Sequence, residues 1–97
     1  MAAGLQAVEW IWRDGEFVPW RDAKLHILSC AVKYGATVFE GICAYRNPAS
    51  GELNVFRLKE HLDRLQDSMR IMRFEQDYTN QKMTDIVLEV QRRNELR

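Results

Sequence analysis

The spacing of hydrophobic residues changes at Leu58 from a period of two to a period near 3.6. Before this residue, short aromatic and β-branched runs are separated by turn residues, which is typical of strands. After it, apolar residues recur along one side of a helix of about four turns: Leu58, Leu62, Leu65, Met69 and Met72. A second amphipathic helix is expected after Thr79-Asn80. No Gly or Pro stops it, so we expect it to reach Arg97, with four residues facing inward: Met83, Ile86, Val87 and Val90.

The first half of the chain predicts several short strands. Asp14-Gly15 separates the runs 9–13 and 16–20, and this pair is a strong hairpin signal because both turn positions favour positive φ. Pro19 cannot donate to a ladder, so the second strand should lie at an edge or end there. Further strands are expected at 24–28, 37–45 and 53–57, the last two paired antiparallel across the loop 47–51. Ser29 predicts the N-cap of a helix of a turn or two that stops at Tyr34-Gly35.

Strands followed by helices indicate an α+β fold of two layers, in which a small antiparallel sheet packs against two amphipathic helices. The chain has 97 residues, enough for one small domain with a thin core. We expect residues 1–8 to be a flexible leader and residues 9–97 to form the domain. The final helix either frays into solvent or continues into a longer protein, and composition does not choose between the two.

Charge and hydropathy exclude some classes of partner. Fourteen basic and fourteen acidic residues give a net charge of zero, which argues against a nucleic-acid partner bound through bulk positive charge. No apolar run approaches the ~18 residues needed to span a bilayer, and the N-terminus lacks the pattern of a secretory signal. The two cysteines, Cys30 and Cys43, form no CxxC pair and are too few for a zinc site by themselves. We expect no metal site and a reducing, cytoplasmic location with free thiols; a single disulfide is the less favoured alternative.

Four residues with phosphate-binding chemistry share one flank of the first long helix: Arg57, His61, Arg64 and Ser68. Two guanidiniums with a hydroxyl and an imidazole nearby can hold a phosphate through charge-assisted hydrogen bonds. From the pattern alone, a solvated helix face with pairs such as Glu60 and Arg64 is the favoured alternative.

In the strand expected at 37–45, one face carries Val38, Glu40, Ile42 and Ala44, and the other carries Phe39, Gly41, Cys43 and Tyr45. A glycine inside a strand often marks the close approach of a ligand or another backbone, and a β-bulge explains Gly41 equally well. Tyr34 can offer its hydroxyl to a ligand, although most such tyrosines belong to the core. His26 has no visible partner, so a core or surface role is favoured over catalysis.

No catalytic lysine is evident. A lysine that captures a carbonyl needs burial or a cationic neighbour to lower its pKa. The lysines all lie in polar or amphipathic stretches: Lys24, Lys33, Lys59 and Lys82. The sequence also lacks the GxGxxG, GxxxxGK[ST] and HExxH motifs.

Several ordered segments resemble the branched-chain amino acid aminotransferases. Residues 12–23 (WRDGEFVPWRDA) look like the family's opening strand pair. Residues 25–29, Tyr34-Gly35 and 38–42 (VFEGI) are similar to its next segment, and 55–65 (VFRLKEHLDRL), ending at Ser68, to its strand-to-helix signature. The resemblance covers roughly residues 10–96, nearly the whole chain.

The resemblance implies the small N-terminal domain of a class IV, pyridoxal-phosphate-dependent aminotransferase, which packs on a larger domain in a homodimer or larger oligomer. Such an enzyme moves an amino group between leucine, isoleucine or valine and 2-oxoglutarate. By position in the motifs, Arg64 would bind the cofactor phosphate, Phe39 and Gly41 would line the substrate pocket, and Tyr34 would reach the partner subunit's site.

The chain departs from the family pattern in two ways. Cys43 stands where the family usually has Arg, which removes a fixed cation from the substrate side. The family's Schiff-base lysine and the carboxylate that pairs with the pyridine nitrogen lie downstream and have no counterpart here, so we expect this chain alone to be inactive. Two alternatives remain: another class IV enzyme, such as a D-amino-acid aminotransferase or an aminodeoxychorismate lyase, or a truncated, non-catalytic oligomerisation module.

Overall fold

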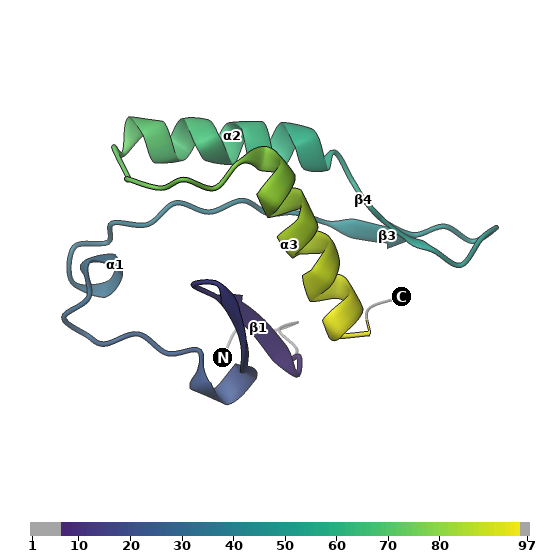
Figure 1. Cartoon of the computed structure of the whole chain (residues 1–97), viewed down its shortest axis with the longest axis horizontal. Helices are drawn as coiled ribbons and strands as arrows, with labels where there is room; N and C mark the ends of the chain where they lie inside the picture. Colours follow the sequence, from purple (N-terminus) through teal and green to yellow (C-terminus); the bar gives the residue numbers. More distant parts are fainter. Residues whose placement is uncertain (1–6, 96–97) are drawn as a thin grey trace.

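The computed structural model describes residues 7–95, which form an α+β arrangement of two hairpins and two long helices (Figure 1). The elements follow in the order β1 (Trp10–Arg13), β2 (Glu16–Pro19), η1 (Trp20–Asp22), α1 (Cys30–Lys33), β3 (Ala44–Arg46), β4 (Leu53–Val55), α2 (Leu58–Ile71) and α3 (Asn80–Arg93). The α+β class predicted from the sequence is confirmed. Residues 1–6 of the expected leader lie outside the described residues.

The N-terminal hairpin forms as its turn residues predict. β1 and β2 pair antiparallel, with Trp12 opposite Phe17. Asp14 and Gly15 both have positive φ, 49° and 95°, as a two-residue hairpin turn requires. Pro19 is the last residue of β2, which confirms that the strand ends there.

The second hairpin is shorter than predicted. β3 pairs with β4 only from Ala44 to Arg46, and one further bond joins the Phe56 amide to the Cys43 carbonyl at 2.8 Å. Arg57 has a left-handed φ of 49° and turns the chain directly into α2, so residues 37–42 have no described strand to pair with. Exposure nevertheless alternates along 36–44, which confirms the two predicted faces.

The strand expected at 24–28 is wrong. These residues are exposed and irregular, and a local turn replaces the ladder: the Leu28 amide donates to His26 Nδ1 at 3.0 Å, and the Ser29 amide donates to the His26 carbonyl. Local side-chain bonds of this kind compete with a ladder when no partner strand lies alongside. The antiparallel strands are divided between two separate two-stranded sheets. Each hairpin pairs only with itself.

The helices begin where the sequence predicts. Ser29 precedes α1, and Gly35, with a φ of 64°, follows its C-cap Tyr34. The Thr79 hydroxyl caps α3 by accepting the Lys82 amide at 3.1 Å. α3 stops at Arg93 rather than continuing through the described residues, because the side chain of Asn94 donates to the Val90 carbonyl and Glu95 adopts a left-handed φ of 56°. Residues 96 and 97 of the predicted helix lie outside the described residues.

The core is thin. Leu62 on α2 is 1% exposed and is the core residue of the described part of the chain, whereas Leu58, Leu65 and Met69 are half-buried. α3 lies between α2 and β1 (Figure 1). Many large apolar side chains are exposed: Trp20, Leu25, Ile27, Leu28, Val32, Tyr34, Phe39, Tyr45, Phe56, Ile71 and Met72. The described helices include none that is long and apolar enough to cross a membrane.

Candidate cofactor and substrate site

A buried carboxylate joins the segment before β3 to α2. Glu40 Oε2 accepts a hydrogen bond from Arg64 Nε at 2.8 Å, and Oε1 accepts one from Arg64 Nη2 at 2.8 Å. His61 Nδ1 lies 2.7 Å from Glu40 Oε1. The Glu40 side chain is only 6% exposed, whereas that of Arg64 is 68% exposed. The guanidinium is therefore held by Glu40 on its protein side and is open to solvent on the other side.

The sequence periods explain how these groups meet. His61 and Arg64 are three residues apart, so they lie on the same flank of α2, next to the apolar stripe. Glu40 lies on the less exposed face of the segment 36–44, between Val38 and Ile42. This segment runs alongside α2 before it enters β3 (Figure 1). A carboxylate on that face needs hydrogen-bonding partners, and α2 provides two, His61 and Arg64.

The contacts among Glu40, His61 and Arg64 favour the ionised form of Glu40. The hydrogen bonds from Arg64 and then from His61 lower the pKa of Glu40 from 4.5 to about 2, so its carboxylate is ionised at neutral pH. An ionised carboxylate only accepts hydrogen bonds, so His61 Nδ1 carries the proton that it donates. The hydrogen bond between Arg64 and Glu40 also raises the pKa of Arg64.

Phe39 and Gly41, the predicted pocket residues, flank Glu40 on the opposite face of the segment. The Phe39 side chain is 86% exposed. A Cβ added at Gly41 would meet nothing within 4 Å, and its φ does not lie in the left-handed region. The described chain itself therefore gives no steric reason for a glycine at this position. Cys43, on the same face, is also exposed and free.

Two members of the predicted phosphate flank lie apart from the cluster. The guanidinium of Arg57 lies over the Phe56 ring, 5.5 Å from its centroid, and makes no described hydrogen bond to Glu40, His61 or Arg64. Ser68 is half-buried, with no side-chain hydrogen bond among those described. Tyr34 is exposed at the end of α1, with Lys33 Nζ 5.1 Å from its ring centroid. The structure thus brings together Glu40, His61 and Arg64.

The lysines have the setting that their sequence context suggests. All four are exposed. Lys59 pairs with Asp63 at 2.7 Å, and this hydrogen bond raises the pKa of Lys59, which is opposite to what a carbonyl-capturing amine needs. Within residues 7–95, no three His, Cys, Asp or Glu side chains gather as a metal site.

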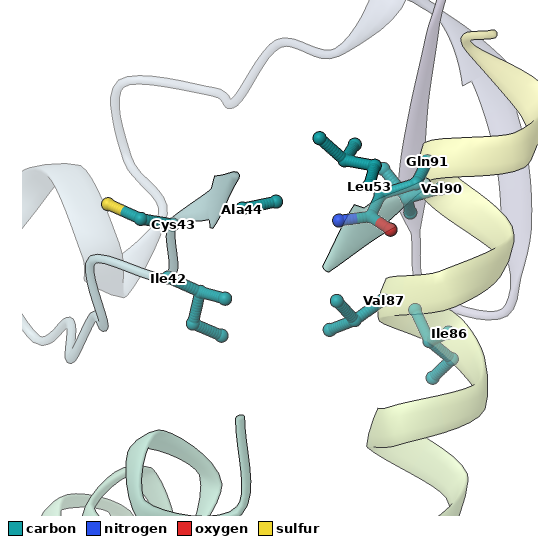
Figure 2. Close-up of a pocket in the computed structure, with 8 residues that line it drawn as sticks. All are labelled: Ile42, Cys43, Ala44, Leu53, Ile86, Val87, Val90 and Gln91. Atoms are coloured by element: carbon teal, nitrogen blue, oxygen red, sulfur yellow. The ribbon is translucent and has the colours of Figure 1, made fainter. Parts of the chain in front are cut away.

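A separate apolar hollow of about 560 Å³ lies between the second hairpin and α3 (Figure 2). Ile42 and Ala44 line one side, and Val87 and Val90 line the other. The Cys43 sulfur points away from the helix in this view. The hollow therefore lies on the face of Ile42 rather than on the face of Phe39 and Gly41.

No family model matches the chain. The branched-chain-amino-acid aminotransferase of Escherichia coli K12 is 42% identical over 88 residues, which cover 91% of this chain and 28% of the relative. The crystal structure of the E. coli enzyme matches with a TM-score of 0.85 and 40% identity, over 92% of this chain and 29% of that one. The branched-chain amino acid aminotransferase of Thermobaculum terrenum, solved in its PLP-form, matches with a TM-score of 0.82 and 30% identity, over 96% of this chain and 30% of that one.

The sequence matches and the structural matches are thus to the same enzymes, the branched-chain amino acid aminotransferases. This chain is homologous to a segment of the branched-chain-amino-acid aminotransferases, as the resemblance predicted. The chain spans a little more than a quarter of the length of these relatives.

Sequence reasoning did not assign a role to Glu40. The available signal was its position on the Val38 and Ile42 face, where a lone carboxylate requires a buried partner. Its actual partners are 21 and 24 residues away in sequence, so only the path of the segment along α2 identifies them.

Proposed function

We propose that this chain forms the N-terminal small domain of a pyridoxal-phosphate enzyme that moves amino groups between leucine, isoleucine or valine and 2-oxoglutarate. The observation that carries the proposal is the guanidinium of Arg64, held on Glu40 with its outer edge exposed. It occurs in a chain 42% identical to branched-chain-amino-acid aminotransferases. The proposal assigns Arg64 to the cofactor phosphate.

The residues present fit a phosphate group. Arg64 has donors that no described side chain uses, and a guanidinium forms paired hydrogen bonds with phosphate oxygens. When bound, pyridoxal phosphate supplies an electron sink for chemistry at the amino acid's α-carbon. The part assigned to this chain is to bind and orient the phosphate.

We assign the face of Phe39 and Gly41 to the substrate pocket. The exposure of Phe39 and the free space around Gly41 support this, because both are explained by a surface or ligand outside the described chain. Cys43 on the same face carries a thiol where the family usually has a cation, so the substrate side of this pocket is more neutral.

The exposed apolar side chains also support a homodimer or larger oligomer in which a larger domain covers this one. In this assembly Tyr34, exposed at the end of α1, reaches the neighbouring subunit's site. The exposed, free thiols of Cys30 and Cys43 support a reducing compartment, the cytoplasm.

A hybrid enzyme tests the proposal, with this chain replacing the segment of the E. coli enzyme that it matches. We expect the hybrid to bind pyridoxal phosphate and to transfer the amino group of leucine to 2-oxoglutarate. Arg64→Ala should weaken cofactor binding by about one to two decades, because each charge-assisted bond contributes about 1.5–3 kcal/mol and about 1.4 kcal/mol is tenfold. Arg64→Lys should recover only part of the loss, because it lacks the planar fork.

The matched control is Arg70→Ala, since Arg70 is an exposed arginine of α2 whose partner among the described side chains is its neighbour Asp67, at 2.7 Å. It should leave cofactor affinity unchanged. Equal losses in the two variants would contradict the assignment of Arg64. The chain alone should show no transaminase activity, and borohydride reduction in the presence of pyridoxal phosphate should label no single lysine. Stoichiometric labelling of one lysine would refute the view that the catalytic amine lies outside this chain.

A further inference from the structure

We propose that Glu40 is a positioning residue that fixes the guanidinium of Arg64 with its phosphate-binding edge turned outward. This inference rests on the proposed function, in which Arg64 binds the cofactor phosphate. It adds a second residue to the phosphate site, one that acts through Arg64 and does not touch the ligand.

The hydrogen-bond pattern divides the guanidinium into two edges. Glu40 uses the Nε–H and one Nη2–H of Arg64, in a side-on, bidentate pair. The hydrogens of Nη1 and the second hydrogen of Nη2 remain at the outer end. Two parallel N–H donors at that end match two oxygens of a phosphate group. Glu40 thus occupies one edge and leaves the other for an anion.

Glu40 can act as a fixed support because it is anchored independently of Arg64. Its side chain is almost fully buried, and His61 makes a third contact with Oε1 at 2.7 Å. Arg64, in contrast, is mostly exposed and would otherwise sample many rotamers. Immobilising a long side chain before the ligand arrives removes part of the entropy cost of binding.

The same support connects the phosphate end of the site with its substrate side. Phe39 and Gly41 are the chain neighbours of Glu40 and lie on the opposite face of the segment. Holding Glu40 on α2 therefore also fixes the position of these two residues relative to Arg64.

The negative charge of Glu40 affects phosphate binding in the opposite direction, so the two possible roles of Glu40 predict opposite changes in affinity. A carboxylate 2.8 Å from the guanidinium neutralises it and weakens its attraction for a phosphate dianion. If Glu40 only neutralises charge, its removal should strengthen phosphate binding. If it positions Arg64, removal should weaken binding despite the gain in net positive charge.

The experiment measures the affinity of the apo form of the hybrid enzyme for pyridoxal phosphate and for pyridoxal, which lacks the phosphate. The ratio of the two dissociation constants reports the phosphate contribution alone. We expect Glu40→Gln to lower this phosphate discrimination about 3- to 10-fold, a coupling typical of residues in one hydrogen-bond network. Glu40→Asp keeps the charge but is too short for the same bidentate contact, and it should lower the discrimination as well. A merely structural role would change both affinities equally and leave the ratio unchanged.

Arg64→Ala separates failure of this inference from failure of the proposed function. If Arg64→Ala leaves the ratio unchanged, the proposed phosphate role is wrong. If Arg64→Ala lowers the ratio while the Glu40 variants leave it unchanged or raise it, Glu40 is not a positioning residue. Adding Glu40→Gln to Arg64→Ala should have no further effect on the ratio.

A crystal structure of the unsubstituted hybrid with pyridoxal phosphate tests the inference even where the Glu40 variants do not fold. Arg64 should keep both hydrogen bonds to Glu40 while its outer edge contacts the phosphate. An Arg64 side chain that leaves Glu40 to reach the phosphate would overturn the inference.

Discussion

Replacing Leu62 by alanine tests whether the chain depends on its thin core. Leu62 is 1% exposed and lies in the second turn of α2. The substitution removes three buried carbons, worth about 0.8 kcal/mol each, and the cavity left behind adds to the loss. We therefore expect the free energy of unfolding to fall by about 2 to 5 kcal/mol.

This loss is large relative to the total free energy of unfolding of the domain. A domain of this size is stable by about 5 to 15 kcal/mol, and a core with so little buried apolar surface belongs at the low end. The assay is urea unfolding of the chain followed by circular dichroism at 222 nm. The matched control is Ile71→Ala at the end of the same helix, where the side chain is 80% exposed and the change should stay within about 0.5 kcal/mol. A Leu62→Ala loss no larger than that of Ile71→Ala would refute the reasoning.

Three further predictions concern stability and association. Asn94 accepts the Trp10 amide at 2.8 Å and donates to the carbonyls of Trp10 and Val90 at 3.0 Å, so Asn94→Ala should lower the free energy of unfolding by about 1 to 3 kcal/mol in urea titrations. Asn94→Asp keeps only the acceptor and should lose less than Asn94→Ala, whereas an unchanged stability of Asn94→Ala would show that the bridge is dispensable. Because the folded-state pKa of Glu40 is about 2 and the reference value is 4.5, its stabilising contribution is complete above about pH 4.5 and is lost as the pH falls towards 2. Unfolding curves between pH 6 and pH 2 should show this loss in the unsubstituted chain and a weaker dependence of stability on pH in Glu40→Gln, and the same pH dependence in both would contradict the lowered pKa of Glu40. The exposed apolar surface around Phe39 and Tyr45 should make the isolated chain self-associate in sedimentation experiments, whereas a clean monomer at high concentration would count against a covering partner.

The sequence alone predicted the elements that local chemistry controls. Asp14-Gly15 defines the first hairpin, since a two-residue turn needs positive φ at both positions. The apolar stripe that begins at Leu58 specifies α2 and includes Leu62, the fully buried side chain of this helix. Thr79 caps α3 through its hydroxyl, as threonine commonly does at a helix N-terminus. The ordered motifs also identified the aminotransferase relatives.

Tertiary structure decided what depends on distant partners. Strand-like composition at 24–28 produced no strand because none of the strands described in residues 7–95 pairs with it. α3 ends at Arg93 because the side chain of Asn94 binds the last turn and β1. The pattern placed Arg64 on one flank of α2, but only the path of the segment 36–44 brings Glu40 against that flank. Side-chain periodicity specifies which face a residue occupies, whereas the partner of that face depends on contacts far apart in the chain.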